Sequence, residues 1–344
     1  MNKKLLAIAV GAAMVAGSTA VMAADEPTIY AKIHLSVDSM DNGGTGDAAD
    51  GLFVSSNSSR LGIKGAVDLD GGMKAVYKYE MSTNYSTASG GLAGNRNAYL
   101  GLKGGFGQII AGRHDMPFKT VGRKADLFGD TIGDHRTVTR AKVGGDDYAD
   151  RRDNVLMYSN SFGAVDLAVA YAPEETGKDN TDMSIGIDFK QGPLKVMFAH
   201  EVHGGGNLTT NNDSTGDIIT GAYKMNEMTF LAGYGQVSDL DGDKGDAGQV
   251  TMMTLGGSMK AGMNTFKLQY TMAESDVSDT ASALLALGVD HKLGKNTSVY
   301  AMYAAISNDD LAGAGFTNSG HDSTVAAVTG EDASGFSLGM IHKF

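Results

Sequence analysis

The residues of this chain that most resemble a catalytic group lie in the run His200-Glu201-Val202-His203. In zinc peptidases, two histidines at positions i and i+4 of a helix hold the metal, and a glutamate beside them acts as general base. Here the spacing is one residue too short, and on a strand His200 and His203 point to opposite faces. The Gly-x-Ser-x-Gly elbow of a hydrolase does not occur in the sequence either. We therefore expect no catalytic residues and no metal site of this kind.

A second candidate is the acidic run Asp239-Leu240-Asp241-Gly242-Asp243-Lys244-Gly245-Asp246, whose alternating carboxylates resemble a calcium loop. It lacks the glycine at position 6 and the glutamate at position 12 that such a loop uses. The run therefore favours a solvated loop and no resident cofactor. Loose binding of Ca²⁺ or Mg²⁺ by acidic extracellular loops is the alternative. The chain has no cysteine, which excludes disulfides and thiolate metal sites.

Charged residues in the first half of the chain suggest a different kind of function, control of an ion path. All eight arginines lie between residues 60 and 152: Arg60, Arg96, Arg113, Arg123, Arg136, Arg140, Arg151 and Arg152. The segment 114–150 contains Asp126, Asp130 and Asp134 as well. Because a guanidinium stays charged and makes directional contacts, basic residues facing these carboxylates would set up a field that controls ion selectivity. The alternative is that the arginines are ordinary rim or salt-bridge residues.

The elements that would position these residues are strands, because polar and apolar residues alternate with a period of two over most of the chain. Arg60 and Lys64, for example, share one face of such a segment, and Leu61 and Ile63 occupy the other. Sixteen strands are expected, at residues 28–38, 58–68, 73–83, 95–103, 106–113, 151–160, 163–172, 181–191, 193–203, 217–225, 227–237, 249–260, 263–273, 282–293, 295–306 and 334–344. Residues 282–293 also fit a helix, although a membrane-spanning helix needs about 20 residues.

The connections alternate between short turns and long acidic stretches rich in Gly and Asn, such as 38–55, which is the pattern of an outer-membrane β-barrel. The exceptional connection is 114–150, and long loops in compact folds are usually functional. A barrel of this size has a lumen wide enough for an aqueous channel. We therefore predict an all-β, sixteen-stranded antiparallel transmembrane barrel in which 114–150 folds inward as a constriction loop.

The N-terminus indicates export. Lys3 and Lys4 precede an apolar stretch of about a dozen residues and the sequence Val21-Met22-Ala23, which predicts a signal peptide at 1–23 and a mature barrel at 24–344. Without the two leader lysines, 26 basic residues face 40 acidic ones, a net charge of −14. This acidity argues against nucleic acid as a partner and favours cations in the channel.

Several motifs carry a family resemblance. They are Ser59-Arg60-Leu61-Gly62-Ile63-Lys64-Gly65, Arg96-Asn97-Ala98-Tyr99-Leu100-Gly101-Leu102-Lys103, Ala125-Asp126-Leu127-Phe128-Gly129-Asp130-Thr131, Arg152-Asp153-Asn154 and the terminal Phe344. With them the sequence resembles the general diffusion porins of Gram-negative outer membranes. The resemblance covers essentially the whole chain and is strongest in the first half and at the C-terminus.

The resemblance implies a homotrimer in the outer membrane, surrounded by lipid and lipopolysaccharide, with Phe344 read by the barrel-assembly machinery. It also implies a basic pore wall at Arg60, Arg96 and Arg113, to which Arg151 or Arg152 adds, and loop acids at Asp126 and Asp130. We add Lys64 to the basic wall because it lies on the second strand with Arg60, and Asp134 to the loop acids because it lies in the same loop.

The sequence departs from the family pattern in the constriction loop. Gly122 stands where many members have another acid, and Lys119, Arg123 and Lys124 make the loop more basic than strong cation selectivity needs. The sign of selectivity therefore stays open. The expected function is passive diffusion of ions and small hydrophilic solutes. A substrate-specific channel on the same barrel is the alternative, and a barrel enzyme is the more distant one.

Overall fold

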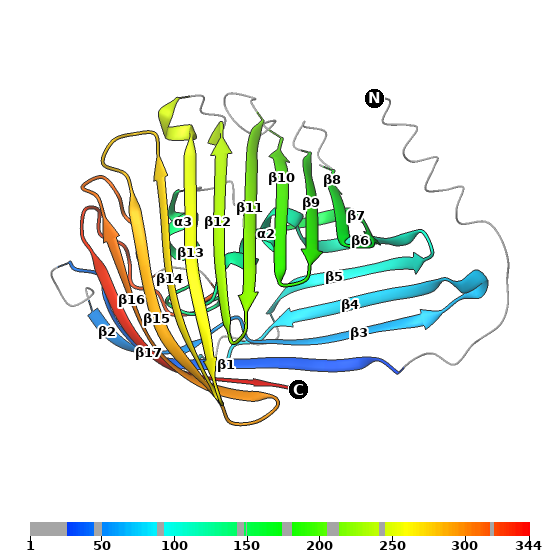
Figure 1. Ribbon diagram of the computed structural model, residues 1–344, viewed down its shortest axis with the longest axis horizontal. Coiled ribbons are helices and arrows are strands. Elements are labelled where there is room, and N and C mark those ends of the chain that lie inside the picture. Colours follow the sequence, from blue (N-terminus) through cyan, green and yellow to red (C-terminus); the bar gives the residue numbers. More distant parts are fainter. Residues whose placement is uncertain are drawn as a thin grey trace.

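The computed structural model describes residues 26–44, 50–87, 93–142, 148, 150–173, 181–204, 213–240, 245–316 and 320–344. In this part of the chain, seventeen strand segments form one antiparallel sheet (Figure 1). The strands are β1 (Thr28–Asp41), β2 (Asp50–Ser56), β3 (Arg60–Asp68), β4 (Lys74–Ser82), β5 (Ala93–Gly104), β6 (Gly107–Asp115), β7 (Arg151–Phe162), β8 (Val165–Ala172), β9 (Asp182–Gln191), β10 (Leu194–His203), β11 (Ser214–Met225), β12 (Met228–Ser238), β13 (Val250–Ala261), β14 (Asn264–Ser275), β15 (Ser282–Lys292), β16 (Thr297–Asn308) and β17 (Ala333–Lys343). The helical pieces are α2 (Pro117–Gly122), α3 (Arg136–Lys142) and the 3-10 turns η2 (Asp70–Gly72), η3 (Arg123–Ala125) and η5 (Asp246–Gly248).

The sheet closes into a barrel where β1 pairs with β17, from Lys32 opposite Lys343 to Asp41 opposite Ser334. Segments β2 and β3 are two parts of one wall strand, because β2 pairs with the second half of β1 and β3 pairs with its first half. The barrel is therefore sixteen-stranded, as predicted. Opposite walls cross in Figure 1, as expected for the tilted strands of a barrel.

The predicted loop 38–55 is wrong at both ends, because β1 continues to Asp41 and the next wall strand begins at Asp50 rather than at residue 58. Small polar residues in this stretch read as a loop. In the barrel, Asp38 and Ser55 are buried on the lumen side, where a polar side chain is tolerated. The strand is interrupted only near Ser58, whose backbone takes a positive φ of 47°.

Alternation sorts each strand into a lumen face and an outer face. On β15, Ser282, Leu284 and Ala286 are buried on the lumen side, whereas Leu285 and Leu287 are exposed on the outside. The strand reading of 282–293 is therefore confirmed, and the helix alternative is wrong. The exposed apolar side chains of the outer face recur around the barrel and match the lipid-facing band of outer-membrane barrels.

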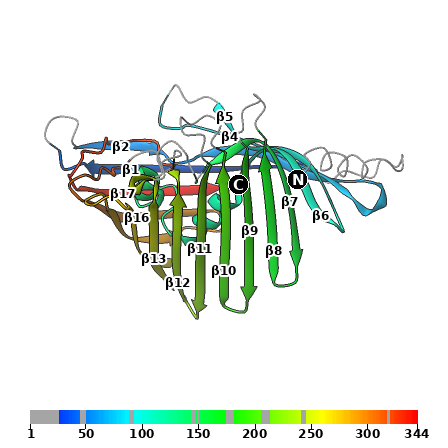
Figure 2. The same cartoon turned by 90° about the horizontal axis from the view of Figure 1, so that it is seen from above.

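The apolar core of the molecule lies inside the barrel, between the long loop and one wall. Phe128, Ile132 and Val138 of the loop pack with inward residues of β15 and β16. Phe118 and Val121 pack with inward residues of β10, β13 and β14. Figures 1 and 2 show α2 and α3 within the ring of strands, where α2 contacts β9 to β11 and α3 contacts β14 and β15. The loop thus covers the wall from β9 to β16 and leaves the passage beside β3 to β7.

Glycines in the covered wall allow this close approach. A Cβ on Gly216 would lie 2.6 Å from the ring of Tyr148, and one on Gly186 would lie 2.9 Å from Pro117. Both glycines are lumen-facing positions where any larger residue would push the loop toward the passage.

Two sequence predictions fall largely outside the described residues. The signal peptide 1–23 lies there entirely, and half of the acidic run 239–246, residues 241–244, does as well, so both stay predictions. Within the described residues, no helix is both long and apolar enough to span a bilayer.

Candidate pore constriction

A cavity of about 410 Å³ separates the long loop from the opposite wall. Its charged lining residues come from wall strands and from the loop. The basic ones are Arg60, Lys78, Arg96, Lys119, Arg123, Lys124, Arg136 and Arg151, and the acidic ones are Glu80, Asp115, Asp130 and Asp150. Basic side chains therefore outnumber acidic ones by two to one in this lining, although the chain as a whole is acidic.

The wall side of the cavity is built by adjacent strands. Arg60 on β3 stands opposite Lys32 on β1 and opposite Ser82 on β4. Glu80 on β4 accepts hydrogen bonds from Arg96 Nε at 2.8 Å and from Tyr30 Oη at 2.7 Å. Sequence reasoning did not single out Glu80, although it lies two positions from Lys78 on the polar face of its strand.

Arg96 reaches the lumen because the β4–β5 pairing is irregular. Simple alternation would place Arg96 on the outer face with Ala98, but the register shifts between the Tyr79 and Met81 pairs. A bulge of this kind inserts one residue and redirects a side chain. Asn97 remains on the lumen side, where its amide donates to Asp115 at 2.9 Å.

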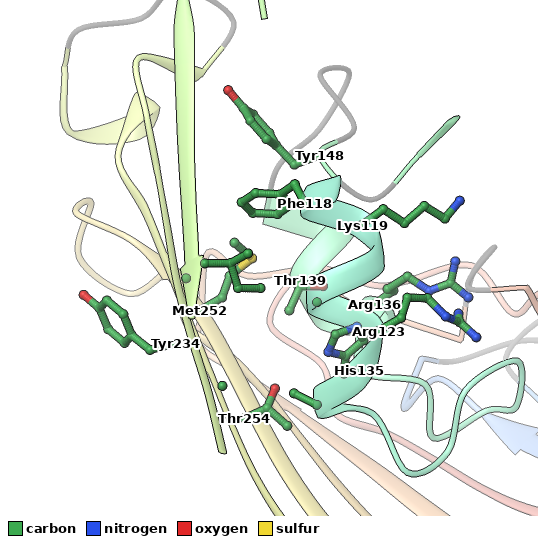
Figure 3. Close-up of a pocket in the computed structure, with 15 residues that line it drawn as sticks. Phe118, Lys119, Arg123, His135, Arg136, Thr139, Tyr148, Tyr234, Met252 and Thr254 are labelled. Atoms are coloured by element: carbon green, nitrogen blue, oxygen red, sulfur yellow. The ribbon is translucent and has the colours of Figure 1, made fainter. Parts of the chain in front are cut away.

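Arg151 and Lys119 meet at one carboxylate. Arg151 Nε lies 3.1 Å and Lys119 Nζ lies 3.0 Å from Asp115 Oδ1. Figure 3 shows Lys119, Arg123 and Arg136 extending from the loop on the side away from Met252 and Tyr234 of the covered wall. The loop thus presents cationic side chains to the passage, and its apolar side packs against the covered wall.

The structure places the other three predicted basic residues outside this lining. Arg113 is paired in register with Ala98, on the outer face, and its Nη1 lies 2.7 Å from Asp153 Oδ1. Arg152 binds Asp182 and the ring of His203, so it ties β7 to β9 and β10.

Lys64 faces the lumen two positions from Gly62, with its Nζ 5.4 Å from the ring centre of Tyr30. Lys64 lies further along β3 than Arg60, and so nearer to the short turn at Asp70–Gly72.

The loop acids are neutralised by cations. Asp130 pairs with Lys32 at 2.8 Å, with Arg123 at 3.3 Å and with Arg136 at 3.4 Å. Asp134 is fully buried, and Arg136 Nη2 lies 2.7 Å from its Oδ2. Despite burial, these cations hold the pKa of both carboxyls well below the usual range. Neither acid faces the passage as a free negative charge.

Asp126 behaves differently from the other two loop acids. Burial, and then the nearby charge of Asp134, raises the pKa of Asp126 to about 7. Its Oδ2 is buried with no hydrogen-bond partner, and its Oδ1 accepts the N–H of Phe128 at 2.9 Å.

Ligand atoms of Asp126, Asp134 and His135 lie within 4.8 Å of one another, which is a possible metal-binding arrangement. Arg123 and Arg136 both donate to Asp134 Oδ2, however, and Arg136 Nε also donates to its Oδ1. Two adjacent guanidinium charges disfavour a metal cation at this place. The group is better described as a buried ion-pair network than as a metal site.

This assignment of Asp126 predicts a pH response of the pore. Asp126 is neutral below pH 7, and it ionises as the pH rises through its pKa of about 7, which weakens the positive potential of Arg123 and Arg136. The reversal potential in a salt gradient should then shift toward cations. Because the pKa is raised, the contribution of buried Asp126 to loop stability is full at acid pH and is lost as the pH rises through about 7. In Asp126→Asn the shift near neutral pH should be absent; an unchanged step would assign it to another group.

The remaining candidates for chemistry are separated in space. His200 pairs with Asp217 and is exposed, whereas His203 is buried on the lumen side next to Glu201, so the two histidines do lie on opposite faces. The ring of His203 stacks on Tyr148 at 4.0 Å. His203 therefore fixes the end of the long loop to the wall.

Comparison with known proteins identifies the family to which this chain belongs. Residues 9–311 match the model of the family described as Gram-negative porin. The chain belongs to this family. Outer membrane porin protein 32 of Delftia acidovorans is 30% identical over the whole of both chains. Outer membrane protein U of Vibrio vulnificus is 28% identical over 72% of this chain and 71% of its own length.

Solved structures show the same fold. The anion-selective porin from Comamonas acidovorans superposes with a TM-score of 0.74 at 23% identity, over 93% of this porin and 99% of its own chain. The trimer form of OmpT from Vibrio cholerae gives 0.69 at 18% identity, over 93% and 99%. Our porin is thus an outer-membrane channel for passive diffusion of ions and small hydrophilic solutes, and its relatives include trimeric proteins.

Proposed function

We propose that this porin is a homotrimeric diffusion channel that favours small anions and carries out no chemistry. The observation that carries the proposal is the charge of the constriction. Among the described residues, the side chains of Arg60 and Lys124 form no salt bridge or hydrogen bond, whereas Asp130 is shared by three cations. An ion that enters the passage therefore meets an excess of positive charge.

The local charges carry more weight than the net charge of −14, which favours cations. Interactions between exposed charges are largely screened beyond about 8 Å at physiological ionic strength. Acidic loops at the mouth therefore contribute less to selectivity than residues lining the narrow passage. The Comamonas acidovorans porin, which has the same fold, is anion-selective, and this supports the same sign.

We also propose that the porin contacts membrane lipid, lipopolysaccharide and the barrel-assembly machinery. The outer apolar face is suited to lipid and lipopolysaccharide. Phe344 directly follows the last strand, β17, and exchanges backbone hydrogen bonds with Ala31, at 3.0 and 3.2 Å. An exposed aromatic side chain at this position is suited to recognition by the barrel-assembly machinery. No cofactor and no nucleic acid enters the proposal.

Recording from planar bilayers with the purified, signal-free trimer tests it. We expect large, ohmic conductance steps that no single solute class blocks in a saturable manner. Saturable block by one class would support the substrate-specific alternative instead. Lack of conductance in correctly folded trimers would refute both channel readings.

A further inference from the structure

A second segment besides the long loop enters the barrel. This segment lies in the connection between β16 and β17. We call its residues 320–332 the C-terminal arm. Ser323 Oγ lies 2.9 Å from Ser55 Oγ of β2, and Asn42 donates its amide to Ala326 O at 2.6 Å. Asp322 accepts hydrogen bonds from Asn84 at 3.2 Å. The arm is thus held along β1 and β2 and reaches the segment that follows β4.

A buried contact between a histidine and a carboxylate fixes the arm to the wall. His321 Nε2 lies 2.9 Å from Asp38 Oδ2, and His321 Nδ1 lies 2.6 Å from the carbonyl oxygen of Ser323. Both ring nitrogens thus lie within hydrogen-bond distance of oxygen atoms that can accept. Asp38 is fully buried, and its Oδ2 also accepts hydrogen bonds from Ser36 at 2.8 Å and from Ser55 at 2.6 Å. Removal of His321 would take away the contact by which the arm meets this buried carboxylate.

The tip of the arm meets the long loop at the constriction. Gly320 lines the same cavity as Arg60 and Arg136. A Cβ on Gly320 would lie 2.6 Å from Asp130 Oδ1 and 3.0 Å from Arg136 Nη2. Its φ of +89° is a conformation that also favours glycine. A side chain here has no room between the arm and the loop without displacing one of them or entering the passage.

Apolar packing joins the arm to the loop as well. Val325 of the arm lies in one buried cluster with Phe128, Ile132 and Val138 of the long loop and with inward residues of β15 and β16. The arm and the loop therefore form one continuous inner layer, although about 190 residues separate Asp130 from Gly320 in the sequence.

We infer that the C-terminal arm is a second constriction element, seated by His321 on Asp38, and that Gly320 is a residue that sets the width of the passage. The inference concerns pore size and is independent of the preferred ion. Its failure would leave the sign of selectivity untouched.

The decisive variant is His321→Ala, recorded as single-channel conductance together with exclusion of polyethylene glycols of graded size. With the arm released, we expect conductance to rise about twofold, because conduction follows the free cross-section of the pore, and larger polymers to enter. His200→Ala is the matched control, since it removes a histidine paired with a carboxylate at an exposed site. It should leave both quantities unchanged.

A disulfide provides the rescue. The chain has no cysteine, and the Ser55 and Ser323 hydroxyls are in contact, so Ser55→Cys with Ser323→Cys gives a pair that oxidation can close. In the His321→Ala background, oxidation should restore wild-type conductance, and reduction should remove the effect. In the oxidised pair with His321 intact, Gly320→Val should lower conductance, because the pinned arm cannot move away.

Wild-type conductance and polymer exclusion in His321→Ala, with no response to oxidation, would overturn the inference. If His321→Ala trimers do not assemble, the Gly320→Val change in the oxidised pair decides alone. An unchanged conductance there would mean that the arm does not border the passage.

Discussion

Arg60→Ser should shift the reversal potential of the channel strongly toward cations, and Arg96→Ser should do the same. The side chain of Arg60 lines the passage and forms no salt bridge in the described structure. Removal of Arg96 leaves Glu80 with one cation fewer, so the local charge falls by one unit in each variant. A unit charge acts on a passing ion at ~4 Å with about 1 kcal/mol in water, which is about a fivefold effect on each ion. Because the effect has opposite sign for anions and cations, the anion-to-cation permeability ratio should change about thirtyfold.

Arg113→Ser is the matched control for both variants. Arg113 was expected in the basic wall, but its side chain lies on the outer face beside the exposed Asp153. Its loss should leave the reversal potential within the error of the wild-type value. A shift in Arg113→Ser as large as that in Arg60→Ser would mean that net charge, not position in the passage, sets selectivity.

Asp134→Ala should release the long loop from the barrel. Asp134 is fully buried and accepts from Arg123 at 3.2 Å, from Arg136 at 2.7 Å and from the N–H of Asp130 at 2.8 Å. Breaking a buried pair leaves an uncompensated charge and costs about 3–5 kcal/mol. We expect noisy, enlarged conductance steps and protease cleavage within the loop, with the β-sheet circular dichroism unchanged.

Asp153→Ala removes a carboxylate from an exposed pair and serves as the control. Surface pairs contribute about 0–1 kcal/mol, so the loop of this variant should resist protease as in the wild type. If Asp134→Ala showed the same resistance and the same quiet conductance, the buried ion pairs would not be what holds the loop.

The sequence predicted the barrel because strand alternation is a local property, and the same is true of the inward loop, which stands out by its length. The direction of Arg96 could not be predicted from period-two alternation, because its side chain points inward as a result of a bulge that depends on the partner strand. Asp50–Ser56 was missed because lumen-facing serines and glycines in a wall strand have the composition of a loop.

The electrostatics of the site could be predicted only in outline. The acids Asp126, Asp130 and Asp134 were identified, but their neutralisation needs Lys32, which lies on the first strand and meets Asp130 only through barrel closure. Gly320 and His321 carry no sequence signal of their own. Their place at the passage follows from tertiary contacts between segments that are distant in the chain.

The most direct test of the account is the reversal potential of the wild-type trimer in a potassium chloride gradient at acid pH, where Asp126 is neutral. Potassium and chloride have nearly equal mobilities, so the sign reports the pore. The charge of the constriction predicts a potential that corresponds to preferred passage of chloride. A potential that corresponds to preferred passage of potassium would contradict it.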